Sequence, residues 1–293
     1  MAPNHLEIRL GEAITRARGQ TVPLNDPEAV ERAADKPLVY RLLADAGLPI
    51  PEHHVFAAGE LAGARDFLAR GPQPCVVKPA RGSGGDGVTG GVCTARDLAR
   101  AARGASRYAP TLLIERQAHG DVFRVLVLDG DVLDVVRRRA PTVTGDGRST
   151  LAQLILREYD RRISGDGDPG LKPFAADLDC ILTLKQQGLS LRSVPGEGIA
   201  VPVKSVTNYN RTLESESVRA AVSDKLCAEA VTATRAAGLR LAGVDVVIAS
   251  ALADSGGVVI DLNPVPALHH HLHVANPAPT STVAVPILRA LLR

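Results

Sequence analysis

The sequence is poor in the features that mark several large classes of protein. Its only cysteines, Cys75, Cys93, Cys180 and Cys227, stand far apart, which argues against a zinc ribbon and against a disulfide scaffold. The formal net charge of +2 provides no general attraction to nucleic acid or membranes. No apolar run reaches membrane-spanning length, and the charges throughout the first 20 residues argue against a signal peptide. We therefore expect reduced cysteines and a cytoplasmic protein without a nucleic-acid or membrane partner.

What is present is an ordinary globular composition, with 45% hydrophobic and 23% charged residues in 293. Strands and helices are mixed, with hairpins instead of strict alternation, which predicts α+β subdomains built on antiparallel sheets. The expected helices cover residues 26–46, 60–70, 95–106, 216–237 and 281–292, and one more begins after a cap at Ser149 or Thr150. The expected strands cover residues 54–56, 75–78, 88–93, 111–115, 123–128, 132–137, 241–248 and 258–263, and loops cover 164–173 and 195–217.

The first candidate site is a β-branched run that ends in a lysine and a glycine-rich turn. Val76 and Val77 favour a buried strand that ends at Lys78, and four glycines between residues 82 and 87 let the backbone approach a ligand closely. An ammonium and several backbone N–H groups around one point suit a polyphosphate. No Gly-Lys-Ser/Thr closes the loop, so it is not the other common phosphate loop. The alternative is an ordinary hairpin turn between two core strands.

The second candidate site lies on the two late strands. Asp245 lies in one, and Asp261 and Asn263 share one face of the next because side chains alternate along a strand. Three oxygen-bearing side chains in apolar sequence suit a hard cation that bridges phosphates. The alternative is that Asp261 and Asn263 only end a strand before Pro264.

Taken in order, these motifs resemble the ATP-grasp superfamily. The motifs are Asp35-Lys36, Val-Val-Lys-Pro, the glycine-rich loop, Ile114-Glu115-Arg116, Gly-Val-Asp-Val and Ile-Asp-Leu-Asn-Pro. The chain is similar to the ATP-grasp domain of cyanophycin synthetase and to the related domain of bifunctional glutathione synthetases, from about residue 10 to the end. The segments that point there are Phe123-Arg-Val-Leu-Val, Val143-Thr-Gly-Asp-Gly-Arg-Ser-Thr150 and Pro266-Ala-Leu-His-His-His271.

The resemblance implies an ATP-grasp fold, in which two α/β subdomains with antiparallel sheets clasp ATP. Residues 1–35 would be a short N-terminal segment, 36–118 the small subdomain and 119–293 the large one. Only 35 residues precede Lys36, so we expect a truncated N-terminal domain, and we expect a homodimer.

The resemblance also implies roles for individual residues. Lys36 and Lys78 would hold the phosphates of ATP, and the hinge from Glu115 to Ala118 would meet adenine. Arg124, with Arg138 or Arg139, would face the transferred phosphoryl group, although strand-borne arginines can also form simple surface pairs. The remaining cofactor-binding residues implied are Arg81, Ser83, Gly84, Gly85, Gly87, Arg116 and Asp121. The implied Mg²⁺ (or Mn²⁺) ligands are Asp245, Asp261 and Asn263, and the implied substrate residues are Lys204, Asn208, His269 and His271.

Two positions depart from the pattern of the relatives. Val122 stands where relatives carry an acidic residue for ribose, and Asp121 is one position early. The run from Tyr209 to Leu213 replaces the Ser-Thr-Gly-Gly segment of the relatives, so substrate choice has diverged. Adjacent histidines on an extended segment point to opposite sides, so at most two of the three histidines at 269–271 could share a zinc ion. We keep zinc as the alternative and assign His269 and His271 to the substrate, as the resemblance implies.

The chemistry that this resemblance implies is ATP-dependent ligation of a carboxylate to an amine of an amino acid or peptide. An acylphosphate would form first, and the amine would then displace phosphate, leaving ADP. Two alternatives are kept: a nucleotide-binding scaffold that has lost turnover, and an ATP-grasp kinase that stops at phosphoryl transfer.

Overall fold

The computed structural model describes residues 5–18, 22–164, 173–207, 215–249, 256–272, 274–276 and 280–292. The chain forms two compact units, each made of segments that are distant in sequence. The first unit contains Met1–Ile50, Ala118–Arg138 and Thr212–Arg293, and the second contains Pro51–Gln117 and Arg139–Arg211. Strand pairing decides these boundaries, so they differ from the consecutive segments expected from the order of the motifs.

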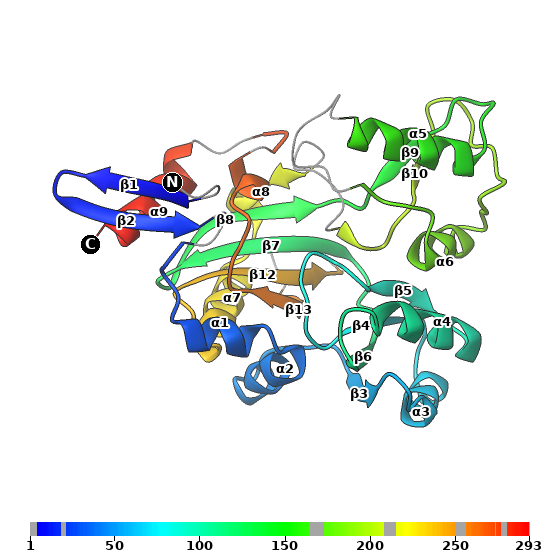
Figure 1. Cartoon of the computed structure of the whole chain (residues 1–293), viewed down its shortest axis with the longest axis horizontal. Helices are drawn as coiled ribbons and strands as arrows, with labels where there is room; N and C mark the ends of the chain where they lie inside the picture. Colours follow the sequence, from blue (N-terminus) through cyan, green and yellow to red (C-terminus); the bar gives the residue numbers. More distant parts are fainter. Residues whose placement is uncertain are drawn as a thin grey trace. The chain divides into compact units, whose positions relative to one another are not determined.

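The first unit is built on a five-stranded antiparallel sheet in the order β11-β8-β7-β12-β13 (Figure 1). Its strands are β7 (Asp121–Leu128), β8 (Asp131–Arg138), β11 (Glu216–Ser217), β12 (Leu241–Ile248) and β13 (Val258–Asn263). A separate hairpin pairs β1 (His5–Leu10) with β2 (Ala13–Arg18). The helices are α1 (Pro27–Ala33), α2 (Lys36–Asp45), α7 (Asp224–Ala236), α8 (His269–Leu272) and α9 (Thr280–Leu291), with a 3₁₀ turn at Arg219–Ala221. Helix α7 packs against β7, β8 and β12, and α8 and α9 pack against β8.

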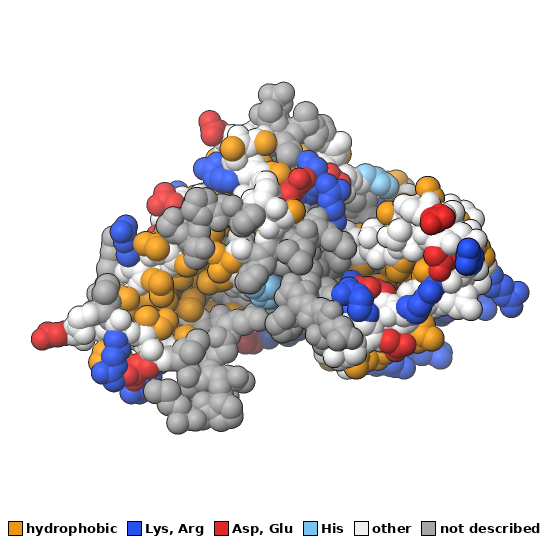
Figure 2. All heavy atoms as spheres, turned by 90° about the horizontal axis from the view of Figure 1, so that it is seen from above, with side chains coloured by type: hydrophobic (Ala, Val, Ile, Leu, Met, Phe, Trp, Pro, Cys, Tyr) orange, Lys and Arg blue, Asp and Glu red, His pale blue; other side chains and the backbone are white. Residues whose placement is uncertain are grey.

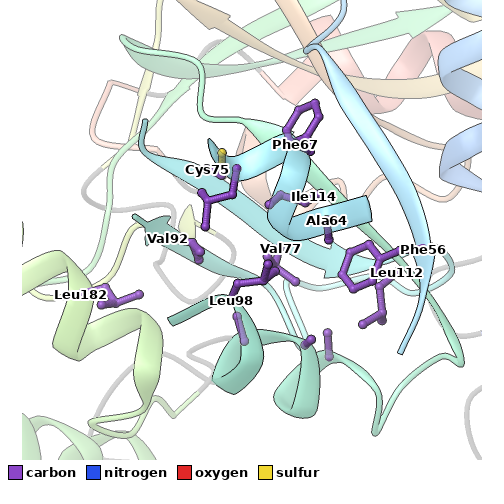
Figure 3. Packing of buried hydrophobic residues seen from close by; sticks show 14 residues of the cluster. Phe56, Ala64, Phe67, Cys75, Val77, Val92, Leu98, Leu112, Ile114 and Leu182 are labelled. Atoms are coloured by element: carbon purple, nitrogen blue, oxygen red, sulfur yellow. The ribbon is translucent and has the colours of Figure 1, made fainter. Parts of the chain in front are cut away.

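The second unit is built on a four-stranded antiparallel sheet in the order β3-β6-β4-β5. Its strands are β3 (His53–Ala57), β4 (Cys75–Pro79), β5 (Thr89–Val92) and β6 (Thr111–Arg116), and β9 (Thr142–Thr144) pairs separately with β10 (Ala200–Pro202). The helices are α3 (Ala62–Arg70), α4 (Ala95–Ala105), α5 (Leu151–Ile163) and α6 (Leu178–Gln186). Side chains of one sheet face, including Cys75, Val77 and Ile114, form a core with Phe67 of α3 and Leu98 of α4 (Figure 3).

Most expected elements are confirmed, and the differences have local causes. The helix expected over 26–46 is two helices, because Asp35 caps a new start by accepting from the Leu38 N–H. Pro37 in its first turn has no N–H to continue the preceding helix. The helix expected from 216 begins only after the Ser223 cap, because Glu216–Ser217 pairs with β8 instead. Helix α6 and the β1–β2 hairpin had not been predicted.

Both hairpin and cap expectations hold in detail. Asp129 and Gly130 have φ of 50° and 93°, the left-handed values that a two-residue hairpin turn needs. Thr150, and not Ser149, is the cap of α5, in a capping box with Gln153. The surface loop expected over 164–173 lies mostly outside the described residues.

The surface carries charges of both signs. Figure 2 shows Lys and Arg side chains interspersed with Asp and Glu on the face that it presents, which agrees with the formal net charge of +2. Among the helices in the described ranges, none is long and apolar enough to cross a bilayer.

Candidate active site

A row of polar side chains crosses one face of the five-stranded sheet. Residues paired across antiparallel strands share a face, and the register places Arg124 opposite Asp245 and Asp245 opposite Asp261. The next row holds Asn263, opposite Gly243. The other face of these strands carries the apolar residues between them, such as Val125 and Val244, which are fully buried. The three expected oxygen donors therefore meet on one face, as the sequence predicted for Asp261 and Asn263.

The guanidinium group of Arg124 forms two hydrogen bonds with the carboxylate of Asp245. Nε donates to Oδ1 at 2.7 Å and Nη2 donates to Oδ2 at 2.6 Å, and both side chains are buried. Burial disfavours the charge on Arg124, but the Asp245 carboxylate more than offsets this and raises the pKa of the guanidinium. Gly243 lies between the side chains of Arg124 and Pro266, and a Cβ on this residue would sit 3.3 Å from Cδ of Arg124. A fork of this kind is suited to two oxygens of one carboxylate or phosphate group.

Arg138 brings a second cation to the same carboxylate. Its Nη1 lies 3.7 Å from Oδ2 of Asp245, and burial together with the neighbouring Arg124 lowers its pKa to about 9. Two buried guanidinium groups beside one carboxylate are suited to stabilising an anion such as phosphate.

The run of three arginines separates as alternation requires. Arg137 points to the opposite face, where it lies over the Phe123 ring and pairs with Glu216 at 3.0 Å. Arg139 is exposed beyond the end of β8. Of the arginines at 137–139, Arg138 is the one that the structure places on the polar face.

Lys36 reaches β13 from the first turn of α2. Its Nζ lies 2.6 Å from Oδ1 of Asp261, and one turn later the Tyr40 hydroxyl donates to the Ile260 carbonyl at 2.8 Å. Residues four apart share one helix face, so the two contacts fix α2 along this strand. Lys36 was expected at the phosphates of ATP, and the structure places it beside one of the proposed metal ligands.

The donor set suits a hard divalent cation by residue type and by face. Two carboxylates and one amide oxygen are what Mg²⁺ prefers. In the described ranges no group of three or more His, Cys, Asp and Glu side chains could hold a metal ion. The donors are engaged by protein groups: Asp245 by Arg124, Asp261 by Lys36, and Oδ1 of Asn263 by the Val265 N–H at 2.9 Å.

The second unit carries the lysine and the glycine-rich loop. Lys78 and Glu115 project from the sheet face opposite the core, and their charged ends lie 2.8 Å apart in a buried ion pair. The loop follows directly, and Gly84, Gly85 and Gly87 have φ between 67° and 78°, values that other residues rarely adopt. Arg81 and Ser83 in this loop are exposed. Glycines at these positions let a ligand approach the backbone closely.

Alternation along β6 separates the two hinge side chains. Glu115 lies on the face of Lys78, whereas Arg116 lies on the core face, where it donates to the Phe67 carbonyl at 2.6 Å and stacks on that ring. The Arg116 side chain is therefore structural, and the Arg116 N–H donates to the Glu52 carbonyl at 2.9 Å. Ala118 is half-buried, and Asp121 is exposed with its carboxylate 3.5 Å from Arg137.

Lys204 is enclosed by carboxylates. The Lys204 side chain is 1% exposed. Its ammonium group lies 2.6 Å from both carboxylate oxygens of Asp177 and 3.5 Å from Oδ2 of Asp179. Asp179 also accepts from the Gly90 N–H at 2.9 Å and from the hydroxyl and N–H of Ser205. These contacts give Lys204 a structural role, and they tie its loop to β5. Asn208 lies outside the described residues.

We expect Asp179→Asn to destabilise the protein by about 3 kcal/mol, because it leaves a buried ammonium with one carboxylate fewer and breaks a shared hydrogen-bond network. Urea unfolding followed by circular dichroism measures this change. The matched control is Asp160→Asn, an exposed carboxylate on α5, for which we expect no measurable change. Equal stabilities of the two variants would contradict the structural role.

The histidine segment is a short helix, α8, and not the extended segment that the sequence suggested. On a strand His269 and His271 would share one side, whereas on a helix two residues two positions apart lie on different sides of the axis. His269 is half-buried, with its ring 4.2 Å from that of His270, while His271 is fully buried against Asp134. The described residues show no zinc cluster at these histidines.

Several residues of this site had not been predicted. Asp134 and Ser217 contact each other beside His271, and Asn25 clamps the ends of two sheet strands by donating to the Leu241 and Pro264 carbonyls, both at 2.7 Å. These residues carry no motif of their own. The only signal for Asp134 is a carboxylate at an inward position of an otherwise apolar strand, where burial demands a partner.

The chain is similar to several known proteins in sequence and in structure. No protein-family model matches the chain. Cyanophycin synthetase of Trichormus variabilis is 30% identical over 276 residues, which cover 90% of this chain and 30% of that protein. Among solved structures, a bifunctional glutathione synthetase from Pasteurella multocida superposes with a TM-score of 0.57 and 24% identity, covering 98% of this chain and 40% of that one. The ATP-grasp ligase PsnB superposes with a TM-score of 0.54 and 19% identity, covering 92% and 63%.

The sheet arrangement and these structural neighbours show that the chain has the ATP-grasp fold, and its similarity to these proteins fits an ATP-grasp ligase. Its sequence relatives include cyanophycin synthetases and the bifunctional glutathione synthetases. The chain spans about a third of the length of the curated relatives that it matches.

Proposed function

We propose that this protein is an ATP-dependent ligase that joins a carboxylate to the amine of an amino acid or peptide, with ADP and phosphate as products. The observation that carries the proposal is the polar row of the five-stranded sheet, where Arg124 and Arg138 share Asp245 beside Asp261 and Lys36. Guanidinium and ammonium groups are the side chains that stabilise the charge of a phosphoryl group. The sequence relatives are synthetases by name and the structural neighbour PsnB is an ATP-grasp ligase, which supports the same reaction class.

The proposed reaction begins with activation of the carboxylate. A carboxylate is a poor electrophile, so it first receives the γ-phosphoryl group of ATP and becomes an acylphosphate. Arg124 and Arg138 would stabilise the charge that develops on the transferred group. Asp245, Asp261 and Asn263 would hold Mg²⁺, which neutralises phosphate charge when it is bound.

Other residues would bind the nucleotide. Lys78 and the N–H groups of the glycine-rich loop, including Ser83 and Gly84, would contact phosphates, and Glu115 would meet adenine. Lys36, which pairs with Asp261 in this structure, would contact a phosphate oxygen when ATP is bound and Asp261 serves as a ligand of Mg²⁺. The absence of an acidic residue at Val122 leaves Asp121 as the candidate ribose contact.

We expect the protein to release ADP and phosphate when it is incubated with ATP, Mg²⁺ and pooled amino acids, with a new amide mass among the products. Phosphate release and mass spectrometry of the mixture measure this. ADP with a phosphorylated acceptor would instead indicate a kinase, and retained ATP binding without turnover would indicate a scaffold. Either result would contradict the ligase proposal.

A further inference from the structure

A buried chain of three polar side chains lies beside the arginine pair. The Ser217 hydroxyl donates to Oδ1 of Asp134 at 2.6 Å, and Nδ1 of His271 lies 2.8 Å from Oδ2. Asp134 is 1% exposed and His271 is fully buried. Both oxygens of the carboxylate are therefore engaged, one by a hydroxyl and one by the imidazole ring.

This geometry fixes which nitrogen of His271 carries the proton. An ionised carboxylate only accepts hydrogen bonds, so Nδ1 donates to Asp134 and the lone pair is on Nε2. Nε2 is buried and has no hydrogen-bond partner in the part of the chain that the structure describes. Buried polar atoms are rarely left without a partner, so an unpartnered acceptor at this place indicates a donor that arrives with a ligand.

The charged surroundings of His271 come from several elements. Arg124 on β7 and Arg138 on β8 lie close enough to repel a proton from the ring, while Asp134 on β8 attracts one, and His270 is the neighbour on α8. Burial, followed by the two guanidinium groups, lowers the pKa of His271 below its ordinary value. The ring is therefore uncharged at neutral pH, with Nε2 able to accept a proton.

We propose that Nε2 of His271 is the base that takes a proton from the ammonium group of the amine substrate, and that Asp134 and Ser217 are the positioning residues that hold it. The inference rests on the proposed ligase function and adds a residue to its second step. The geometry places this base beside the two arginines assigned to the transferred phosphoryl group, where the acylphosphate must lie for the amine to attack it.

The step balances in atoms and electrons. One N–H proton of the ammonium group passes to Nε2, and the nitrogen lone pair then forms the C–N bond. The C–O bond to phosphate breaks, and phosphate leaves with that electron pair. A second proton of the attacking nitrogen goes to the departing phosphate, and His271 returns its proton to solvent. The products are an amide and inorganic phosphate.

The two arginines make the basicity of His271 depend on whether substrate is bound. In the free protein their charges disfavour a proton on His271. Phosphoryl groups bound by Arg124 and Arg138 compensate those charges, so the ring becomes more basic once the acylphosphate has formed. The amine is then deprotonated beside an electrophile and not beforehand.

The two halves of the reaction can be separated with hydroxylamine, whose nitrogen is uncharged at neutral pH and needs no base before it attacks. Full-length protein is incubated with ATP, Mg²⁺ and pooled amino acids, once with hydroxylamine and once without, and hydroxamate and amide products are measured by mass spectrometry. The variant is His271→Asn, which keeps an N–H donor near the position of Nδ1 and removes Nε2. Thermal unfolding checks that the variant is folded.

We expect His271→Asn to lower amide formation about 100-fold while hydroxamate formation continues at the wild-type rate. An equal fall in both products would show that His271 is merely structural, and undiminished amide formation would show that no base acts there; either result overturns the inference. If the wild-type protein forms neither hydroxamate nor amide with any acid, the ligase function itself fails, and the base assignment fails with it.

The positioning residue is tested by Asp134→Asn, with Asp131→Asn at the exposed start of the same strand as its matched control. Asparagine can donate to Nδ1 and so favours the tautomer with a proton on Nε2. We expect a lower kcat for the amine without a change in the KM for ATP. We also expect a shift of the low-pH limb of the rate profile, which a general loss of stability would not produce. Identical profiles for the two variants would overturn the role of Asp134.

Discussion

Arg124→Met is expected to lower the ligation rate about 1,000-fold, because it removes a two-armed donor from a buried site where charge develops on the phosphoryl group. The same change leaves Asp245 buried with only the more distant contact to Arg138, at 3.7 Å. We therefore also expect a loss of about 3 kcal/mol in the free energy of unfolding. Initial rates of ADP release and urea unfolding measure the two effects.

A double variant separates stability from catalysis. In Arg124→Met/Asp245→Asn the charge pair is removed as a whole, so the protein should regain much of the lost stability while its activity stays low. The control is Arg137→Met, the arginine of β8 that points to the opposite face. Near-normal ligation by a folded Arg124→Met variant would mean that the polar row is not the reaction centre.

Lys78→Met is expected to weaken binding of a non-hydrolysable ATP analogue about 100-fold, since one charge-assisted hydrogen bond contributes roughly 3 kcal/mol at most. Isothermal titration calorimetry measures the dissociation constant. The variant also removes the ammonium group that lies 2.8 Å from the buried Glu115 carboxylate. Lys78→Met/Glu115→Gln removes both charges, and it should be more stable than the single variant and still bind weakly.

The matched control for Lys78→Met is Lys185→Met, an exposed lysine on α6 of the same unit, which should bind the analogue as the wild-type protein does. If Lys78→Met binds as tightly as this control, Lys78 serves only as the partner of Glu115, and the phosphate contact inferred for it is wrong.

The elements nearest the site were well predicted because their signals are local. The Asp129-Gly130 turn, the strand that ends at Lys78 and the strand pair that carries Asp245 and Asp261 depend on alternation and on backbone freedom. A sequence displays both directly. Helix α8 was misjudged because three consecutive histidines show no period, so nothing local distinguished a helical turn from an extended segment.

Partners that are distant in sequence could not be predicted in the same way. Lys36 was expected at phosphates, and nothing in its own surroundings indicates Asp261, which is 225 positions away in the chain. Arg116 donates to the carbonyl of Phe67, which is 49 positions away in the chain, and nothing next to Arg116 in the sequence indicates this partner. Asp134 and Ser217 meet His271 only because β8 pairs with β11 and α8 packs on β8.

The sequence by itself determined which chemical groups this protein possesses, in which order, and on which face of a strand each would lie, because propensity and alternation act between near neighbours. The tertiary structure alone decided which of those groups touch. It set Arg124 and Arg138 on one carboxylate and gave His271 a buried aspartate, since the register between strands depends on the packing of the whole sheet and not on any single segment.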